Sequence, residues 1–502
     1  AMGLPRKLGV SGAALFVFGV SFGFVVFPHL LKSKASTLKN GTATREMWAK
    51  VPFSLEFSAY VFNVTNPMEV AKGEKPILRD VGPYVYDEWL EKVDLVDRDY
   101  DDTLEYSRRR TWIFNPEKSE SLTGNEIVTV PHLFILGAVM ATMRERPATI
   151  GKAIDSIFKK PDSIFIQTTV HDFLFGGLPI DCNVKDFAGK AVCTFVKSSP
   201  DLVRDGENLD DNRIRVKRGL KDIYQVGQVT EYKGEPEQAI WPKGSRCNLY
   251  NATDGTIVHP YLFQDEAIVS FSPDLCRTFS SSWDGIHTNR YYFDLGDLSS
   301  EPEWNCFCDT EDTCTKKGLF DLFKCVGVPM VVSLPHFYKV HKSYLKQVVG
   351  LRPSKNEHQV VFDFEPVTGT PVAARNGLQF NMFVHPIEKL RIMKTFATAL
   401  MPIFWIQEKV RVPDEYLAQI RMLFTAMNVV GYVFCDYISK QNYMHESYVR
   451  KVIINSYTCS VTNLVCSEKK YMNMNIALIS LGILDLDAFG SISHIPNGLH
   501  CL

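Results

Sequence analysis

Charged side chains are absent from residues 8–31, a run of 24 residues rich in Phe, Val, Leu and Gly. A helix that crosses the ~30 Å hydrocarbon core of a bilayer needs about 20 such residues. The run could also be a buried core helix, but such a helix is rarely this long without a polar face. A cleaved signal peptide has an apolar core of only ~7–15 residues that ends in small residues, whereas this run ends in FPHLLK. The sequence therefore predicts a transmembrane helix at residues 8–31 after a cytoplasmic tail of residues 1–7.

Cysteine is absent from the first 181 residues, and eight cysteines then lie between Cys182 and Cys325. An even number of cysteines in one stretch is typical of disulfides formed in the secretory pathway. The alternative is a structural zinc site at Cys306, Cys308, Cys314 and Cys325. Their C-x-C-x5-C-x10-C spacing differs from the paired spacing of zinc knuckles, so disulfides are the preferred interpretation.

Catalytic signatures are missing too. The sequence has no Walker loop, no H-E-x-x-H or C-x-x-C motif, and no dinucleotide-binding glycine fingerprint after a predicted strand. Gly19, Ser21 and Gly23 match the G-x-S-x-G pattern of a hydrolase, but that serine needs a strand-to-helix turn, which a transmembrane helix does not supply. The sequence therefore predicts a binding or transport protein without cofactor or metal, and not an enzyme.

An excess of one charge is also missing, because 55 Lys and Arg residues stand against 57 Asp and Glu residues, for a net charge of -2. No broad basic field invites a nucleic acid partner. The local run of Arg108, Arg109 and Arg110 is interpreted as a solvated strand edge.

Three N-glycosylation sequons are present, at Asn40, Asn63 and Asn251. Each is meaningful only if the chain after the transmembrane helix enters the secretory lumen. Together with the cysteines, they predict an extracellular ectodomain at residues 32–421.

Alternating apolar and polar residues predict antiparallel strands. The clearest is residues 54–66, and similar patterns occur in TLEYSRRRTWIF, NRIRVKRG, QVVFDFEPV and LQFNMFVHP. Residues 75–89 read as two short strand-like runs on either side of Gly82 and Pro83. The apolar residues 131–158 predict two helices, with Pro131 in the first turn and Pro147 at the break.

Several long motifs carry a resemblance to a known family. The first is MWAKVPFSLEFSAYVFNVTNPMEVAKGEKPILRDVGPYVYDEW, and others are LTGNEIVTVPH, NATDGTIVHPYL, FSPDLCRTF, NCFC, SLPHFY and PIFWIQEKV. They resemble the class B scavenger receptor and fatty-acid translocase family, in particular its insect sensory members. The resemblance implies an α+β fold with an antiparallel β-barrel core, many short helices, a helical cap and an internal apolar tunnel.

The resemblance also implies disulfide partners, which spacing cannot choose among the 105 pairings of eight cysteines. Carried over by position, three pairs are Cys247–Cys306, Cys276–Cys325 and Cys308–Cys314. Cys182 and Cys193 are paired because they are close in the sequence and are the two cysteines left after the other three pairs are assigned.

A possible ligand contact comes from the same resemblance. Lys159 and Lys160 align with cap lysines that meet a fatty-acid head group in related lipid transporters. The other interpretation is two solvated lysines that close a helix at the negative end of its dipole.

The C-terminal segment, residues 422–502, departs from the family. Its longest uncharged run, residues 422–435, has 14 residues, about 6 fewer than an ordinary membrane span needs. The segment therefore lacks a clear second transmembrane helix, and either an altered final exon or a single-pass variant accounts for it.

Two functions compete. The resemblance implies a plasma-membrane receptor in olfactory cilia that captures a fatty-acid-derived pheromone or other lipid and passes it to an odorant receptor or to the membrane. The alternative is a general scavenger, lipid-uptake or adhesion receptor for lipoproteins or proteins. Rebinding of small lipids after delipidation would favour the first hypothesis.

Overall fold

The computed structural model describes Phe18, Ser21 and residues 36–142, 153–158, 161–178, 182–198, 206–260, 262, 266–283, 290–301, 304–308, 314–365, 368–388 and 390–418. The predicted transmembrane helix, apart from Phe18 and Ser21, and the segment 422–502 lie outside the described residues. Within the described part of the chain, no helix combines the length and apolarity needed to cross a membrane.

One large antiparallel sheet of twelve strands forms the body of the protein, and its main path runs β10-β11-β14-β15-β16-β1-β2-β3-β6-β7. The strands of this path are β1 (Leu55–Val64), β2 (Leu78–Arg98), β3 (Thr103–Phe114), β6 (Gly206–Lys217), β7 (Val229–Tyr232), β10 (Ser282–Trp283), β11 (Arg290–Phe293), β14 (Val360–Glu365), β15 (Thr370–Val384) and β16 (Ala399–Arg411). Beside the path, β12 (Leu319–Asp321) pairs with β13 (Val331–Ser333), which also pairs with β15.

Two small hairpins complete the strands. The first joins β4 (Ile127–Pro131) to β5 (Phe165–Thr169), and the second joins β8 (Val269–Ser272) to β9 (Arg277–Ser280). The predicted α+β class is therefore correct, with an antiparallel sheet as its core. Among the described strands the pairing path stays open between β10 and β7, so the closed barrel and its tunnel remain predictions.

The strand predictions from alternation agree with β1, β3, β6, β14 and β15. The two short runs predicted around Gly82 and Pro83 are instead one strand of 21 residues, β2. The pairing of β1 with β2 shifts register between Ala59 and Val61, opposite this Gly-Pro step. Such a bulge tolerates a proline without a backbone N–H, so the strand continues where local sequence predicted a break.

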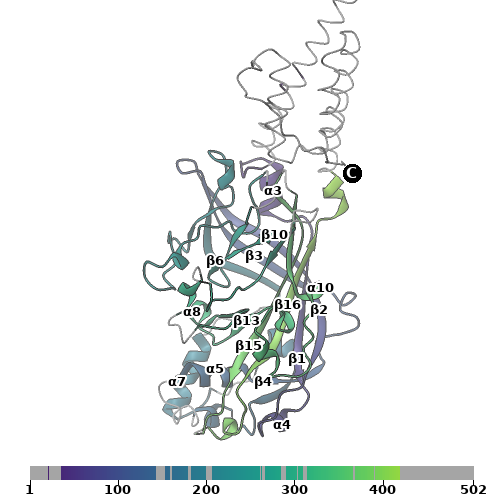
Figure 1. Cartoon of the computed structure of the whole chain (residues 1–502), viewed down its shortest axis with the longest axis vertical. Coiled ribbons are helices and arrows are strands. Elements are labelled where there is room, and N and C mark those ends of the chain that lie inside the picture. Colours follow the sequence, from purple (N-terminus) through teal and green to yellow (C-terminus); the bar gives the residue numbers. More distant parts are fainter. Residues whose placement is uncertain are drawn as a thin grey trace, which may run out of the picture.

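Short helices decorate the sheet, namely α3 (Ala43–Ala49), α4 (Pro67–Val70), α5 (Leu133–Thr142), α7 (Phe187–Ser198), α8 (Phe323–Val326), α9 (Lys342–Leu345) and α10 (Lys355–His358). In Figure 1, α3 lies at one end of the body, and α4, α5 and α7 gather at the other. We call these the α3 end and the cap end.

The helix predicted from Pro131 begins later than expected. Pro131 is the last residue of β4, and α5 begins at Leu133. The backbone N–H of Leu136 donates to the carbonyl of His132, which is the first hydrogen bond of the helix. Placing Pro131 in the helix was therefore wrong, because the hairpin partner β5 holds it in a strand. Pro147 lies outside the described residues.

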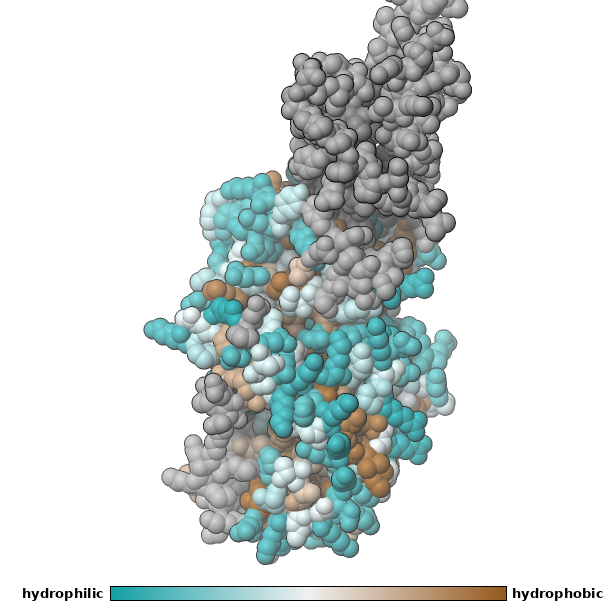
Figure 2. Space-filling view, in the orientation of Figure 1, coloured by the Kyte–Doolittle hydropathy of each residue, from teal (hydrophilic) through white to brown (hydrophobic). Residues whose placement is uncertain are grey.

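The two faces of the main sheet differ in burial. Along β2, Tyr84, Tyr86 and Glu88 occupy alternate positions and are all buried, as is Val85 between the two tyrosines, and on β3 the buried Tyr106 and Trp112 lie on the same face as Glu88. We call this the inner face. The face shown in Figure 2 is largely hydrophilic, with scattered hydrophobic residues, some of which gather toward the cap end. The polar exterior suits a domain surrounded by water.

Candidate ligand-binding site

The run of Arg108, Arg109 and Arg110 lies in the middle of the sheet, because β3 pairs with both β2 and β6. Alternation places Arg108 and Arg110 on the inner face, where their side chains are only 18% and 32% exposed. Arg109 points the other way and pairs with Glu91. The prediction of a solvated edge is therefore wrong, since no local pattern indicated that β6 would pair with β3.

The two inner arginines contact carboxylates from other elements. Arg108 Nη2 lies 2.6 Å from Asp210 Oδ2 on β6 and 3.0 Å from Asp274 Oδ1, in the turn between β8 and β9. Arg110 Nη2 lies 3.4 Å from Asp274 Oδ2. Burial alone would raise the pKa of Asp274, but the charges of Arg108 and Arg110 lower it to about 2. Asp274 therefore stays ionised at neutral pH.

An internal cavity of about 120 Å³ lies against these arginines. Its apolar wall includes Leu90, Ile214, Val229, Phe271 and Pro273, and its polar wall includes Lys92, Tyr106, Arg108, Arg110, Asp254 and Thr256. One water needs about 10–15 Å³ of such volume, so the cavity has room for several waters or for the polar group of a larger ligand.

Asp274 contacts both inner arginines, although its side chain is 56% exposed.

Lys92 brings a further cationic group to the cavity. Its Nζ donates to the carbonyl of Trp48 on α3 at 2.9 Å and lies 4.3 Å above the ring of the same tryptophan. Burial lowers the pKa of Lys92 to about 8, although the charge of Asp254 opposes this shift. The contact with the indole ring favours the charged form as well. Because Trp48 belongs to α3, the cavity lies toward the α3 end.

A larger hollow of about 380 Å³ lies on the outer side of the protein and opens broadly to solvent. Glu56, Lys118, Arg375, Lys409 and Arg411 are among the residues that line it. A charged, open hollow leaves an apolar ligand in contact with water, so the smaller internal cavity is the better candidate site. Among the described residues, no group of three His, Cys, Asp or Glu side chains could hold a metal.

The structure contains four disulfides, Cys182–Cys193, Cys247–Cys306, Cys276–Cys325 and Cys308–Cys314. They are the four pairs anticipated from the sequence and the family resemblance. The three bonds in residues 247–325 bind the long, irregular connections between β7 and β13 to one another. Cross-links between distant segments stabilise such loop-rich regions chiefly by restricting the unfolded chain.

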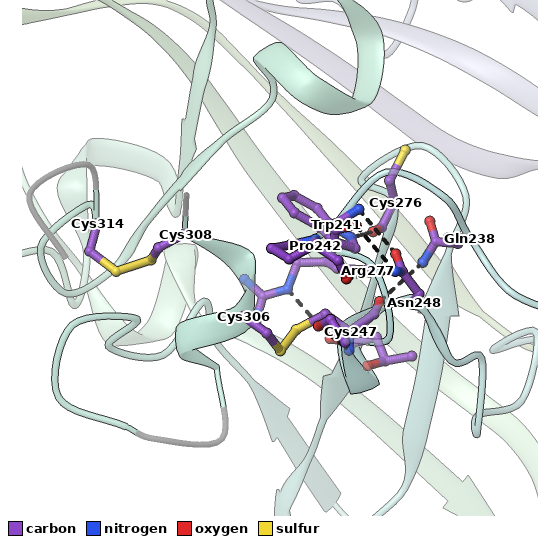
Figure 3. Close-up of a disulfide and its surroundings, with 12 residues drawn as sticks. Gln238, Trp241, Pro242, Cys247, Asn248, Cys276, Arg277, Cys306, Cys308 and Cys314 are labelled. Atoms are coloured by element: carbon purple, nitrogen blue, oxygen red, sulfur yellow. Dashed lines mark hydrogen bonds between the residues drawn. A yellow bond between two sulfur atoms is a disulfide. The ribbon is translucent and has the colours of Figure 1, made fainter. Parts of the chain in front are cut away.

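Arg277 lies beside two of these disulfides, and Figure 3 shows it next to Trp241 and the Cys247–Cys306 bond. Its guanidinium carbon lies 4.5 Å from the ring centre of Phe279 and 4.6 Å from that of Phe307. Burial lowers the pKa of Arg277 to about 9, so it remains cationic at neutral pH. The indole N–H of Trp241 donates to the carbonyl of Cys276 at 2.9 Å. These contacts hold the aromatic and disulfide residues of this region together.

The three sequons differ in exposure. Asn40 and Asn251 are exposed, as glycan attachment requires. Asn63 is half-buried in β1, and its Oδ1 accepts a hydrogen bond from the backbone N–H of Thr129. Glycosylation at all three positions remains a prediction.

Lys159 and Lys160 lie outside the described residues. On one side of them, the ring of Phe158 packs against His132 with 4.6 Å between ring centres. On the other, the carbonyl of Pro161 accepts a hydrogen bond from Arg391. The two lysines therefore follow a residue anchored in the cap end, and their role in ligand binding remains a prediction.

Two carboxylates of the FDFEP motif have structural partners. Asp363 forms a two-point ion pair with Arg290, with both N–O distances at 2.7 Å. Glu365 accepts hydrogen bonds from the backbone N–H and the hydroxyl of Thr368. Both carboxylates therefore hold neighbouring segments of the fold together.

Sequence reasoning missed the polar residues of the inner face, namely Glu88, Lys92 and Trp112. The signal was present, because Tyr84, Tyr86, Glu88, Leu90 and Lys92 occupy alternate positions of one strand. The tyrosines and Leu90 face the interior, so alternation places Glu88 and Lys92 on the same inner face.

These features define a class of protein. Disulfide-linked antiparallel domains are typical of proteins that fold in the secretory pathway. The chain belongs to the CD36 family, because the model of that family matches residues 10–439. It is therefore a class B scavenger-type receptor, a membrane protein with an extracellular ectodomain.

The similarity extends to named insect proteins. The chain is 45% identical to Sensory neuron membrane protein 1 of Apis mellifera over 455 residues, which cover 86% of this chain and 87% of the relative. It is 41% identical to the protein of the same name from Mamestra brassicae, over 85% of this chain and 87% of the relative. The Manduca sexta protein of that name is 40% identical, with the same coverage of 85% and 87%.

Proposed function

We propose that this protein is a receptor for hydrophobic, lipid-derived ligands in insect olfactory neurons, where it captures pheromone molecules at the cell surface. The observation that carries the proposal is the cavity of about 120 Å³ beside the inner face of a CD36-family ectodomain. The names of the relatives support a role in sensory neurons.

The ligand passes through the ectodomain along an apolar tunnel in a barrel-like core. Residues 8–31 anchor the chain, residues 32–421 form the ectodomain, and the cap end receives the ligand. The cavity is lined by Tyr106, which belongs to the same buried cluster as Leu38, a residue that follows the proposed anchor by seven positions. Burial of an alkyl chain at about 25 cal/mol per Å² supplies the driving force for entry.

The ligand then reaches an odorant receptor in the same ciliary membrane, or the membrane itself. Expression of the transcript separates this role from general lipid uptake. Restriction to pheromone-sensing neurons would support the olfactory role, whereas expression in gut or fat body would contradict it.

Direct binding tests the ligand class. The full chain is stripped of lipid, reconstituted in nanodiscs and titrated with a fluorescent long-chain alcohol, with lipoprotein particles as the comparison. Saturable binding of the small amphiphile is expected. Binding of lipoprotein particles alone would favour the scavenger or adhesion receptor instead.

A further inference from the structure

Four large apolar or aromatic side chains are exposed at the α3 end of the body. Tyr100 is 73% exposed in the turn between β2 and β3, and Tyr224 is 51% exposed in the loop that follows β6. Leu220 in the same loop is 42% exposed, and Met47 on α3 is 39% exposed. We call these four residues the α3-end cluster. Single exposed apolar side chains are ordinary, whereas several gathered at one end of a domain indicate a contact surface.

The segments that carry the α3-end cluster are bonded to one another. Arg45 of α3 lies 2.7 Å from Asp97 at the end of β2. Lys221 donates to the carbonyl of Tyr100 through its Nζ and to Asp102 through its backbone N–H, both at 2.8 Å. Figure 1 shows β3 and β6 running toward the end of the body that carries α3. The turn, the loop and the helix therefore form one continuous end of the ectodomain.

The start of the ectodomain is held on this same end. Leu38 is fully buried, with 0% exposure, and its backbone N–H donates at 2.9 Å to the carbonyl of Arg218, two residues before Leu220. The hydroxyl of Ser36, which is also buried, donates to the carbonyl of Thr368 at 3.5 Å. Residues 36–38 are therefore packed against the loop that carries Leu220.

This attachment places the α3 end close to the bilayer. The predicted anchor ends at Leu31, five residues before Ser36. Even a fully extended chain spans only about 3.3–3.6 Å per residue, so Ser36 lies within about 18 Å of the edge of the hydrocarbon core. The head groups fill about 5–8 Å of that distance. Ser36 therefore lies at most about 12 Å beyond the head groups, and the segments packed around it are within reach of them.

The residue types of the α3-end cluster suit the boundary between head groups and hydrocarbon. Tyrosine is enriched at this boundary, because its ring is apolar and its hydroxyl still finds a polar partner. Leucine and methionine side chains gain free energy when they leave water. A surface of these types is more favourably placed in the head-group layer than in bulk water.

Charges of both signs surround Tyr100. Asp99, whose side chain is 92% exposed, lies 2.8 Å from Arg218. The Nζ of Lys217 donates to the carbonyl of Asp101 at 2.8 Å. A surface on which acidic and basic groups alternate suits a zwitterionic head group such as phosphatidylcholine, whereas its aspartates repel an acidic lipid.

We propose that the α3-end cluster is a membrane-contact surface. Tyr100, Leu220 and Tyr224 enter the head-group layer of the outer leaflet and hold the ectodomain in a fixed orientation above the anchor. The partner is the lipid bilayer in which the chain is itself anchored. This inference rests on the anchor at residues 8–31 and goes beyond the proposed function, since it does not depend on which ligand the receptor binds.

The test measures lipid contact in the full chain, reconstituted in phosphatidylcholine nanodiscs. Tyr100→Trp and Tyr224→Trp each add one tryptophan to the seven of the native chain. Emission is compared between nanodiscs with ordinary acyl chains and nanodiscs with acyl chains brominated close to the head groups, since bromine quenches tryptophan on contact. After subtraction of the native signal, the added emission should be severalfold weaker in the brominated nanodiscs at both positions.

Phe187→Trp is the matched control. Phe187 is 85% exposed on α7, at the cap end, so a tryptophan there should emit equally in both kinds of nanodisc. A second comparison tests the apolar cause of the contact. In the Tyr224→Trp protein, Tyr100→Ser together with Leu220→Ser should reduce the quenching severalfold, and Phe187→Ser should leave it unchanged. Each variant is first checked for native thermal unfolding.

Three results would overturn the proposal. The first is unquenched emission at both positions 100 and 224, the second is quenching that requires acidic phospholipid, and the third is equal quenching in Phe187→Trp and Tyr100→Trp. Ligand titration of the same nanodiscs keeps the proposed function separate. Absence of lipid contact with intact ligand binding refutes this inference alone, whereas absence of ligand binding with intact lipid contact refutes only the proposed function.

Discussion

Glu88 makes a prediction about stability that is independent of any ligand. In the folded protein burial raises the pKa of Glu88 to about 8, whereas a glutamate in an unfolded chain titrates at about 4.3. The folded state therefore holds a proton that the unfolded state has lost over the whole interval between these values. Replacing Glu88 by Gln removes the titration and keeps the size of the side chain.

The sign follows from proton linkage. Because the pKa is raised on folding, the stabilising effect is complete below pH ~4.3 and is lost as the pH rises through about 8. One pKa unit corresponds to about 1.36 kcal/mol, so this shift is worth on the order of 5 kcal/mol across the interval. Structural relaxation or water entry would reduce that figure, and a loss of 2 kcal/mol would still be readily measured.

The assay is denaturant unfolding of the full chain in micelles at pH 5, 7 and 9. The free energy of unfolding of the native protein should fall toward high pH, and Glu88→Gln should flatten that dependence. Glu56→Gln changes an outer-face carboxylate of β1 and should follow the native protein. If Glu88→Gln and the native protein showed the same dependence on pH, Glu88 would not be the buried acid described above.

Other predictions concern covalent features and the cap end. Replacing both cysteines of Cys276–Cys325 by Ser, which opens a loop with a sequence separation of 49, should lower the free energy of unfolding by about 4 kcal/mol in denaturant titrations. Glycosidase treatment of secretory-pathway protein should shift its mobility, with fuller occupancy at the exposed Asn40 than at the half-buried Asn63; unchanged mobility would contradict the luminal assignment. Changing Lys159 and Lys160 together to Ala should weaken binding of a fluorescent fatty acid by ~1–3 kcal/mol at unchanged surface expression, and equal binding would leave them as helix caps.

Local patterns predicted much of the sheet, because a strand with one buried face shows alternation in its own sequence. β1, β3 and β15 were found in this way. Local patterns did not predict which strands pair with one another, because the paired strands come from segments far apart in the chain. The sequence alone suggested that Arg108 and Arg110 lie at the surface. In the structure they are covered because β6, about 100 residues later, pairs with β3, and Asp274 in the β8–β9 turn supplies a carboxylate.

The candidate site was harder to predict for the same reason. Long family motifs supplied the disulfide partners and the receptor class, but they carry no information about which polar side chains meet inside. Glu88 lies in the motif that begins at Met47, yet its significance depends on Trp112, from the next strand, and on Glu408, from the other end of the chain. Only the folded sheet brings these three together.

The inner face handles ionisable groups in three physically different ways, and the differences bear on ligand binding. Arg108 and Asp274 neutralise one another as an ion pair, and Lys92 shares its charge with the indole ring of Trp48. Neither carboxyl oxygen of Glu88 has a hydrogen-bond partner among the described residues, and Glu88 instead retains its proton. An ion pair resists a new polar partner because binding it would break existing contacts, whereas a neutral acid with free hydrogen-bonding capacity gains from one. Retaining its proton therefore allows Glu88 to stay fully buried on a face whose other ionisable groups remain charged.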